Sequence, residues 1–199
     1  MEVQRLKAID LRYPAQLHTL ESPPTLTAIG LLEVLQQKSW LAVFCSSRCP
    51  GSLIIQAQDV AHELVKQNTA VIGGFHSTVE REILRVLLRG KNPVIVVPAR
   101  GLTPYRIPPE FQSALESERL LLLSPFSDDV TRSSENLAWK RNLFVSDFAN
   151  SALVIHASAG SATEKLVRQT IQKKTVFTLP DETNTPLLEM GVRKWLGKT

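Results

Sequence analysis

The chain has 199 residues, 43% hydrophobic and 21% charged, and its 23 Lys and Arg against 19 Asp and Glu give a net charge of +4. This composition is typical of a globular domain with a full core and argues against disorder. No apolar run is long enough to cross a bilayer, and the first residues lack the basic and apolar segments of a signal peptide, so we expect a cytoplasmic protein without a membrane partner. The mild positive charge permits a phosphate-bearing partner without requiring one.

The first 38 residues differ from the rest because two short motifs with proline, Tyr13-Pro14 and Pro23-Pro24, interrupt them. Within them, Leu26–Ile29 predicts a short strand and Leu31–Leu35 a helical turn. We interpret residues 1–38 as a short N-terminal extension that packs on a core domain formed by residues 39–199.

From Trp40 onward, short apolar segments alternate with helical ones. Six segments are apolar throughout, as strands buried on both faces are: Leu41–Ser46, Thr69–Ile72, Pro93–Val97, Leu120–Leu123, Ala152–Ile155 and Thr175–Leu179. Helices are predicted for Ser52–Gln67, Ser77–Arg89, Pro108–Glu118, Ser133–Asn150, Ser161–Lys173 and Pro186–Leu196. Such alternation predicts an α/β fold, a Rossmann-like three-layer α/β/α arrangement with a mostly parallel sheet.

Ligands of such sheets bind outside the carboxyl ends of the strands, where three loops are of interest. The first loop runs from Cys45 to Ser52. Its small residues let a ligand approach the backbone, its hydroxyl and N–H groups suit phosphate, and Arg48 adds a planar donor. The alternative is that Ser52 only caps the following helix. The loop has no GxGxxG pattern, which makes a dinucleotide a weak interpretation.

The second loop is Gly73-Gly74-Phe75-His76-Ser77. Paired glycines allow positive φ and a close approach of the backbone. Phe75 and His76 either stack on a base or fill the loop. We interpret His76 as a polar loop residue, because no partner for a catalytic base is near it in sequence.

The third loop is Ala157–Glu164. Gly160 and Ser161 can present N–H and hydroxyl groups to phosphate, or Ser161 caps the next helix with Glu164 at the capping-box offset. Both roles are compatible. The basic candidates near this rim are Arg48, Arg100, Lys140 and Arg141.

Cys45 and Cys49 are the two cysteines of the chain. Two cysteines without a second pair or clustered histidines make a poor zinc site, and they do not form a disulfide framework. We interpret them as small, semi-buried residues and expect neither a metal nor a cofactor.

In this order the loops resemble the DNA-processing protein A family (DprA, also called Smf), from about Tyr13 to about Pro180. The matching pieces are Tyr13-Pro14, Pro23-Pro24-Thr25-Leu26 with Gly30, Ser46-Ser47-Arg48, Ile72-Gly73-Gly74-Phe75, Arg141-Asn142, Ala159-Gly160-Ser161 and Val176–Pro180. Ser46 stands where the family has a glycine, and Ser77–Arg81 does not match the family's Gly-Ile-Asp segment with its histidine.

The resemblance implies a Rossmann-like domain that binds single-stranded DNA in a positive pocket, helps to load a recombinase and supports natural transformation without a catalytic reaction. We expect a minimal member with this domain only. The expected partner is single-stranded DNA or a nucleotide, and a recombinase and a second copy of the chain remain open as further partners. The candidate binding residues are Ser46, Ser47, Arg48, Gly73, Gly74, Arg100, Arg141, Asn142, Gly160 and Ser161; none is assigned a catalytic role.

Two alternative functions stay open. One is a nucleoside-monophosphate phosphoribohydrolase similar to the plant "lonely guy" proteins, which carry Pro-Gly-Gly-x-Gly-Thr-x-x-Glu. Ala159–Glu164 keeps one Gly, a Thr and a Glu of that motif at a different spacing, so Glu164 is the candidate carboxylate. The other is a sensor of a nucleotide-derived signal, which the sequence does not separate from a DNA-binding protein.

Overall fold

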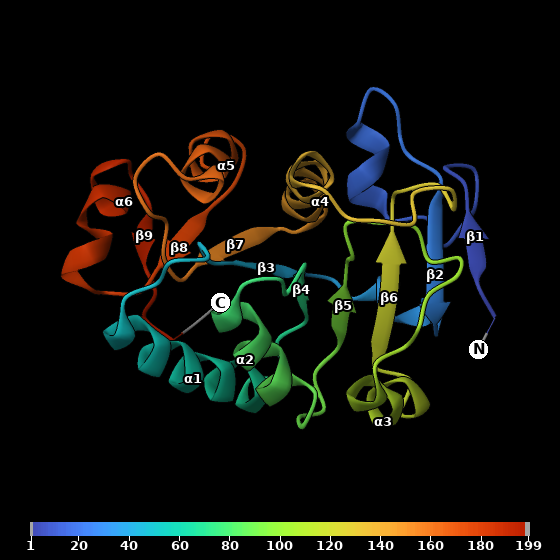
Figure 1. Ribbon diagram of the computed structural model, residues 1–199, viewed down its shortest axis with the longest axis horizontal. Helices are drawn as coiled ribbons and strands as arrows, with labels where there is room; N and C mark the ends of the chain where they lie inside the picture. The colour runs from blue at the N-terminus through green and yellow to red at the C-terminus, as the bar shows by residue number, and fades with distance from the viewer. Residues whose placement is uncertain (1, 198–199) are drawn as a thin grey trace.

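The computed structural model describes residues 2–197, and these form one mixed sheet of nine strands between two layers of helices (Figure 1). The strands are β1 (Gln4–Leu6), β2 (Leu26–Gly30), β3 (Leu41–Phe44), β4 (Val71–Gly73), β5 (Val94–Val96), β6 (Leu120–Ser124), β7 (Ser151–Val154), β8 (Val176–Thr178) and β9 (Arg193–Lys194). Their order is β1-β2-β6-β5-β4-β3-β7-β8-β9. The β1–β2 and β2–β6 pairs are antiparallel and the other pairs are parallel, which confirms the predicted mostly parallel sheet.

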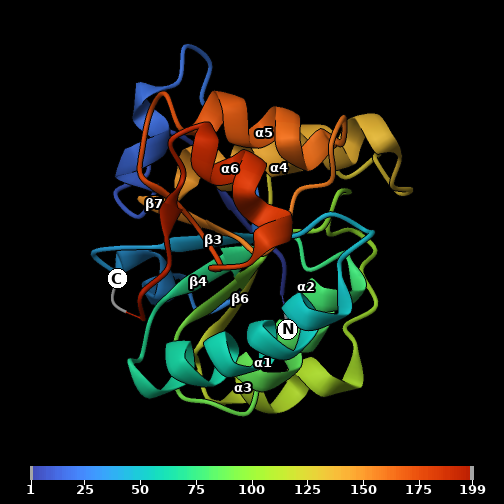
Figure 2. The ribbon, with the colours of Figure 1, turned by 90° about the vertical axis from the view of Figure 1, so that its left-hand side faces the viewer.

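The helices cover both faces of the sheet, as Figure 2 shows from the side. One face carries α1 (Gly51–Lys66), α2 (Thr78–Leu87) and α3 (Gln112–Glu116), and the other carries α4 (Glu135–Phe148), α5 (Ala162–Thr170) and α6 (Thr185–Glu189). Short 3₁₀ turns are η1 (Ala15–Thr19), η2 (Leu32–Gln36), η3 (Pro109–Phe111) and η4 (Glu182–Asn184). The three-layer arrangement follows from the β–α–β connections. No helix among residues 2–197 is long and apolar enough to cross a membrane.

Two apolar cores lie on opposite faces of the sheet, and β3 contributes to both. Ala42 and Phe44 pack in the core under α4 and α5, whereas Leu41 and Val43 pack in the core under α1 and α2. Side chains of a strand point alternately to the two faces, so a strand covered on both sides must be apolar throughout. This is the physical reason why the uninterrupted apolar runs mark the central strands.

Residues 4–30 contribute the antiparallel edge of this sheet. β2 pairs with β6, so that Thr27 faces Ser124, and β1 adds outside β2. The hydroxyl of Tyr13 donates to the carbonyl of Pro24 at 2.7 Å and closes the connection between the two strands. The predicted strand at 26–29 is confirmed, whereas the division of the chain at residue 38 stays a prediction.

The predicted helix over Pro186–Leu196 is only half right. α6 ends at Glu189, and Gly191 has a φ of 96°, a left-handed conformation that stops a helix. The chain then forms β9, and the N–H of Trp195 donates to the carbonyl of Thr178 at 2.8 Å. Leu187, Val192 and Trp195 of this segment are buried in the cores of the sheet.

Candidate nucleic-acid interface

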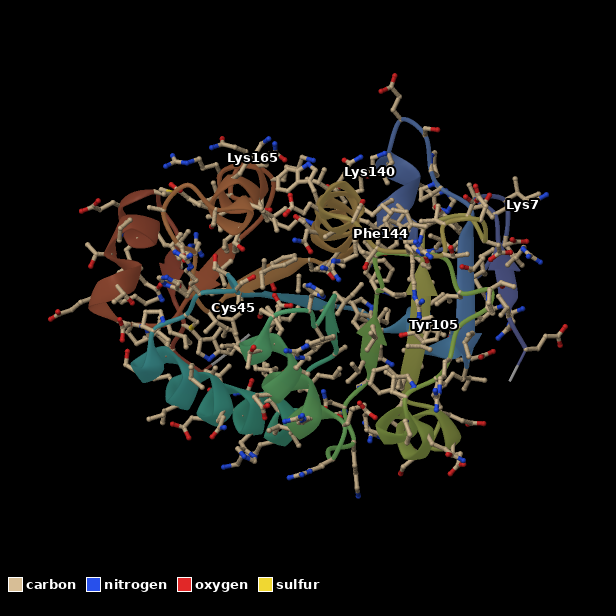
Figure 3. The ribbon with its side chains drawn as sticks, in the orientation of Figure 1. Lys7, Cys45, Tyr105, Lys140, Phe144 and Lys165 are labelled. Carbon is tan, nitrogen blue, oxygen red and sulfur yellow. The ribbon has the colours of Figure 1, made fainter. Side chains whose placement is uncertain are left out.

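A pocket of about 800 Å³ opens at the carboxyl ends of the central strands. Its walls come from the end of β3, the first turns of α2, the segment after β5 and the start of α4. Figure 3 labels Cys45 and Tyr105, which line it, and shows Lys140 on the side of α4 that faces away from the sheet. The volume is in the range of small-ligand sites. The pocket therefore lies where the fold type predicts ligand binding.

The structure divides the ten candidate binding residues into two groups. Lining the pocket are Ser47, Gly74, Arg100, Arg141 and Asn142. The other five, namely Ser46, Arg48, Gly73, Gly160 and Ser161, lie in the same loops but outside the lining. A role of either group in binding stays a prediction.

Arg141 is a buried residue of the pocket wall, with only 4% of its surface exposed. Its Nη1 donates to the carbonyl of Val97 at 3.2 Å, and its Nε donates to Oδ1 of Asn142 at 2.7 Å. A Cβ atom at Gly74 would lie 1.8 Å from Nη1 of Arg141. Gly74 thus lets the backbone approach the guanidinium of Arg141 closely, while its approach to a ligand stays a prediction. Positive φ, which we also expected of the glycine pair, is instead found at Phe75, with a φ of 47°.

Glu80 is a second buried charge beside the pocket, and we did not identify it from the sequence. One carboxylate oxygen accepts from the N–H of Cys45 at 2.8 Å, and the other accepts from the N–H groups of His76 at 2.7 Å and Ser77 at 3.3 Å. Ser77 in turn caps α2 by accepting from the N–H of Glu80. Ser77 and Glu80 form a complete capping box, a signal that their spacing of three offered in the sequence.

The charges of Glu80 and Arg141 influence one another. Burial raises the pKa of Glu80, and its backbone hydrogen bonds and the positive charge of Arg141 oppose that shift. Burial lowers the pKa of Arg141, and the charge of Glu80 opposes it. Each ion thus reduces the cost of burying the other. Through its hydrogen bonds Glu80 joins the end of β3 to the β4–α2 loop, and Arg141 joins α4 to the segment after β5.

Ser46 connects the first and third loops. Its Oγ accepts from the N–H of Ser158 at 3.1 Å and lies 3.1 Å from Oγ of Ser161. The hydroxyl of Ser158 donates to the carbonyl of Arg48 at 3.1 Å. Because Ser46 is buried and these groups are engaged within the protein, they hold the loops in position, whereas the side chains of Ser47 and Arg48 are exposed.

The capping role of Ser161 is confirmed, since its Oγ accepts from the N–H of Glu164 at 3.1 Å. The carboxylate of Glu164 does not complete the box on Ser161 but accepts from the N–H of Gly160 at 2.6 Å and from Arg168 at 2.6 Å. The hydrogen bond from Arg168 lowers the pKa of Glu164 most, and the hydrogen bond from the N–H of Gly160 lowers it further.

The alternative role of Ser52 as a helix cap is wrong. α1 begins at Gly51 after Pro50, and Pro50 provides no side-chain cap. Ser52 lies within the first turn, where its hydroxyl donates to Asp181 at 3.0 Å. The first loop therefore presents a helix N-terminus without a side-chain cap.

His156 and Asn184 form a buried polar pair behind the loops, which we did not predict from the sequence. Nδ1 of His156 lies 2.9 Å from Oδ1 of Asn184, whose Nδ2 donates to the carbonyls of Ile155 and Leu179. Because Oδ1 of Asn184 accepts, Nδ1 of His156 carries the proton. The carbonyl of His156 accepts from the N–H of Ser46 at 2.9 Å, so the pair supports the first loop. The two residues lie far apart in sequence, and neither belongs to a recognisable motif.

Arg100 and the cysteines complete the surroundings of the pocket. The guanidinium of Arg100 lies 4.8 Å from the ring centroid of Tyr105, a cation–π contact. Cys45 is buried, Cys49 is half-buried, and the two are not joined in a disulfide. Burial raises the pKa of both thiols, which favours their protonated form. In the part of the chain that the structure describes, no group of three His, Cys, Asp or Glu side chains is placed to hold a metal ion.

Comparisons with known proteins support one family. The model of a family described as DNA recombination-mediator protein A matches residues 4–196. Among solved structures, DNA processing protein A from Streptococcus pneumoniae gives a TM-score of 0.82 at 17% identity, over 98% of this chain and 71% of that one. A comparison with curated proteins gives no match.

Two further solved structures share the fold. DNA processing protein A from Helicobacter pylori, described for its single-stranded DNA binding mode, gives a TM-score of 0.79 at 20% identity and covers 97% of this chain and 90% of that one. A molybdenum cofactor binding protein from Rippkaea orientalis gives a TM-score of 0.55 at 11% identity and covers 80% of this chain and 88% of that one. At such identities the likeness shows the Rossmann-like fold and nothing of the ligand.

Proposed function

The chain belongs to the DNA recombination-mediator protein A family, and on this premise we propose that it is a DNA-processing protein that binds single-stranded DNA at the rim of its pocket. The proposal includes the cytoplasm as its location. It also includes a recombinase and a second copy of the chain as candidate partners. The structures of similar fold that are named as DNA processing protein A support the general role.

The observation that carries the proposal is the exposed Arg48 on a firmly held loop beside the pocket. Ser46 and Ser158 fix the backbone around Arg48, so its guanidinium is presented to a ligand with little loss of backbone freedom. Arg81 and Arg100 add further positive charge to the pocket lining, whereas Arg85, which also lines the pocket, is paired with Glu82. Arginine forks suit phosphate oxygens, and several of them along one rim suit a strand of linked phosphates.

The environment of Glu164 supports a binding protein over a phosphoribohydrolase. Its carboxylate is engaged by Gly160 and Arg168, and the residue does not line the pocket. A hydrolase of that type needs a carboxylate and an arginine that face the glycosidic bond. The buried carboxylate of Glu80 is likewise engaged, by three backbone N–H groups.

A salt-dependent titration tests the proposal. Affinity for a labelled single strand of thymidines is measured between 50 and 200 mM salt, with duplex DNA and mononucleotides as comparisons. Each phosphate contact on a single strand contributes about 0.7 to the slope of log affinity against log salt, so Arg48→Ala should reduce the slope by about that amount.

Arg89→Ala is the matched control, because Arg89 is exposed beyond the far end of α2 and should leave the slope unchanged. Absence of salt-dependent binding to single strands, or equal slopes in the parent and Arg48→Ala, would overturn the proposal.

A further inference from the structure

Arg141 and Asn142 line the pocket side by side, and we call this part of the lining its floor. The floor offers hydrogen-bond donors that the protein does not use. Nε and Nη1 of Arg141 are engaged by Asn142 and Val97, and among residues 2–197 Nη2 has no partner. Nη2 is accessible to solvent, although only 4% of the surface of Arg141 is exposed. Because Oδ1 of Asn142 accepts from Arg141, the group that remains on Asn142 is its amide Nδ2, also a donor.

The charge of this floor favours a neutral ligand group over a phosphate. The charge of Arg141 is already opposed by the buried Glu80. Glu110 and Glu135 also line the pocket, but they are exposed and share the lining with Arg81, Arg85 and Arg100, so they do not set the charge of the floor. A phosphate at the floor would meet the buried carboxylate of Glu80, which already offsets Arg141, whereas exposed positive charge is available on Arg48 outside the lining and on Arg81. The phosphates therefore belong at the rim, and the floor suits a neutral group that only accepts hydrogen bonds.

The walls of the pocket suit a flat ring. Half-buried Tyr105 and Trp139 contribute aromatic surface to the lining, with Arg100 4.8 Å from the ring centroid of Tyr105 and Nζ of Lys165 5.0 Å from that of Trp139, whereas Phe75 and Phe111 belong mainly to the core behind it. Aromatic side chains stack on nucleobases, and a purine offers the larger surface for stacking. A strand bound along the rim can place one base in the pocket below it.

We propose that the pocket selects guanine, with Nη2 of Arg141 and Nδ2 of Asn142 donating to O6 and N7 of that base. Guanine presents these two acceptors side by side, whereas adenine replaces one of them with an amino donor. A donor-only floor leaves that amino group without a partner, which costs affinity. This inference rests on the proposed binding of single-stranded DNA and adds base selection to it.

The test uses four strands of thymidines that differ at one central position, which holds dG, dA, dC or 7-deaza-dG. The dG strand should bind the parent protein about tenfold more tightly than the dA strand, the scale of a two-donor contact to one base. The 7-deaza-dG strand lacks the N7 acceptor and should lose most of this advantage. Since this arm uses the parent protein, it does not depend on the folding of a variant.

Asn142→Ala should reduce the preference for dG while the salt slope stays that of the parent. Lys140→Ala is the control on the same helix, because Lys140 is exposed on the outer side of α4 and should keep the preference (Figure 3). Three outcomes would overturn the inference while leaving the proposed function intact. They are equal affinity for the four strands, tighter binding of the dC strand than of the dG strand, and equal affinity for the 7-deaza-dG and dG strands. Absence of binding to every strand would overturn both.

Discussion

Gly74 and Arg141 pack so closely that one added methyl group would occupy the place of the guanidinium. The nearest atoms to a Cβ at Gly74 would be Nη1, Cζ and Nε of Arg141, at 1.8, 2.0 and 2.5 Å. Arg141 in turn donates to Val97 and Asn142. The glycine is therefore needed here for close packing, and the arginine connects α4 to the loop that follows β4.

Gly74→Ala should displace the guanidinium of Arg141 and lower the free energy of unfolding by about 1–3 kcal/mol, the usual cost of overpacking. Affinity for single-stranded DNA should fall as well, because the pocket wall moves. Denaturant unfolding and strand titration measure the two effects. Gly51→Ala is the control, since a Cβ there meets nothing within 4 Å. If both variants were equally stable, the packing role of Gly74 would be wrong.

Ser46→Ala should loosen the first loop from the third. The change removes the acceptor of the half-buried Ser158 N–H, and the loss of such a hydrogen bond costs about 0.5–1.5 kcal/mol. Urea denaturation of the variant checks this value. Ser117→Ala removes an exposed hydroxyl that donates to Ser113 and should change stability by no more than about 0.5 kcal/mol. Parent-like stability of Ser46→Ala would show that the two loops are held by other contacts.

The buried thiol of Cys45 predicts a loss of stability at alkaline pH. An unfolded thiol ionises near pH 8.5, whereas burial keeps the folded thiol protonated because its pKa is raised. Ionisation then favours the unfolded chain, so the free energy of unfolding should fall as pH rises above about 8.5. Unfolding curves between pH 7 and 10 test this, and Cys45→Ala should show a smaller fall. An equal fall in the variant would assign the effect to other groups.

Glu164→Ala should leave the affinity for single-stranded DNA unchanged or slightly higher, because the change removes a negative charge near the loops. The cap of α5 by Ser161 remains in this variant. The same preparations are assayed for release of base from nucleoside monophosphates, where we expect none. Base release by the parent that disappears in Glu164→Ala would instead favour the hydrolase alternative.

The strands that are buried on both faces could be predicted from the sequence alone. The apolar runs of β3 to β8 reflect the two cores, and the loops after them had to lie at one edge of a parallel sheet. β1 and β9 escaped prediction because they have three and two residues and exist only through pairing with β2 and β8. Strands this short carry no periodic signal.

The candidate site was predictable as a set of loops but not as a set of contacts. Ser46 was expected to face a ligand, yet its hydroxyl bonds to Ser158 and Ser161, which are more than 100 residues away in sequence. Asn142 and Arg141 were selected as a pair, but only the structure shows which of their nitrogens the protein itself uses. Such information depends on side-chain packing between distant segments, and a local pattern does not contain it.

The antiparallel pairing of β2 with β6 determines the order in which the sheet can be assembled on the ribosome. Thr27 faces Ser124, 97 residues later, so β2 leaves the ribosome well before its inner neighbour exists. At ordinary rates of synthesis this interval lasts about 5–20 s. During it β2 can pair only with β1, while β3, β4 and β5 can already begin to form their own sheet. β2 can therefore take its place in the sheet only after β6 has been made, and until then the backbone N–H and C=O groups on that edge of β2 are open to pairing with other chains.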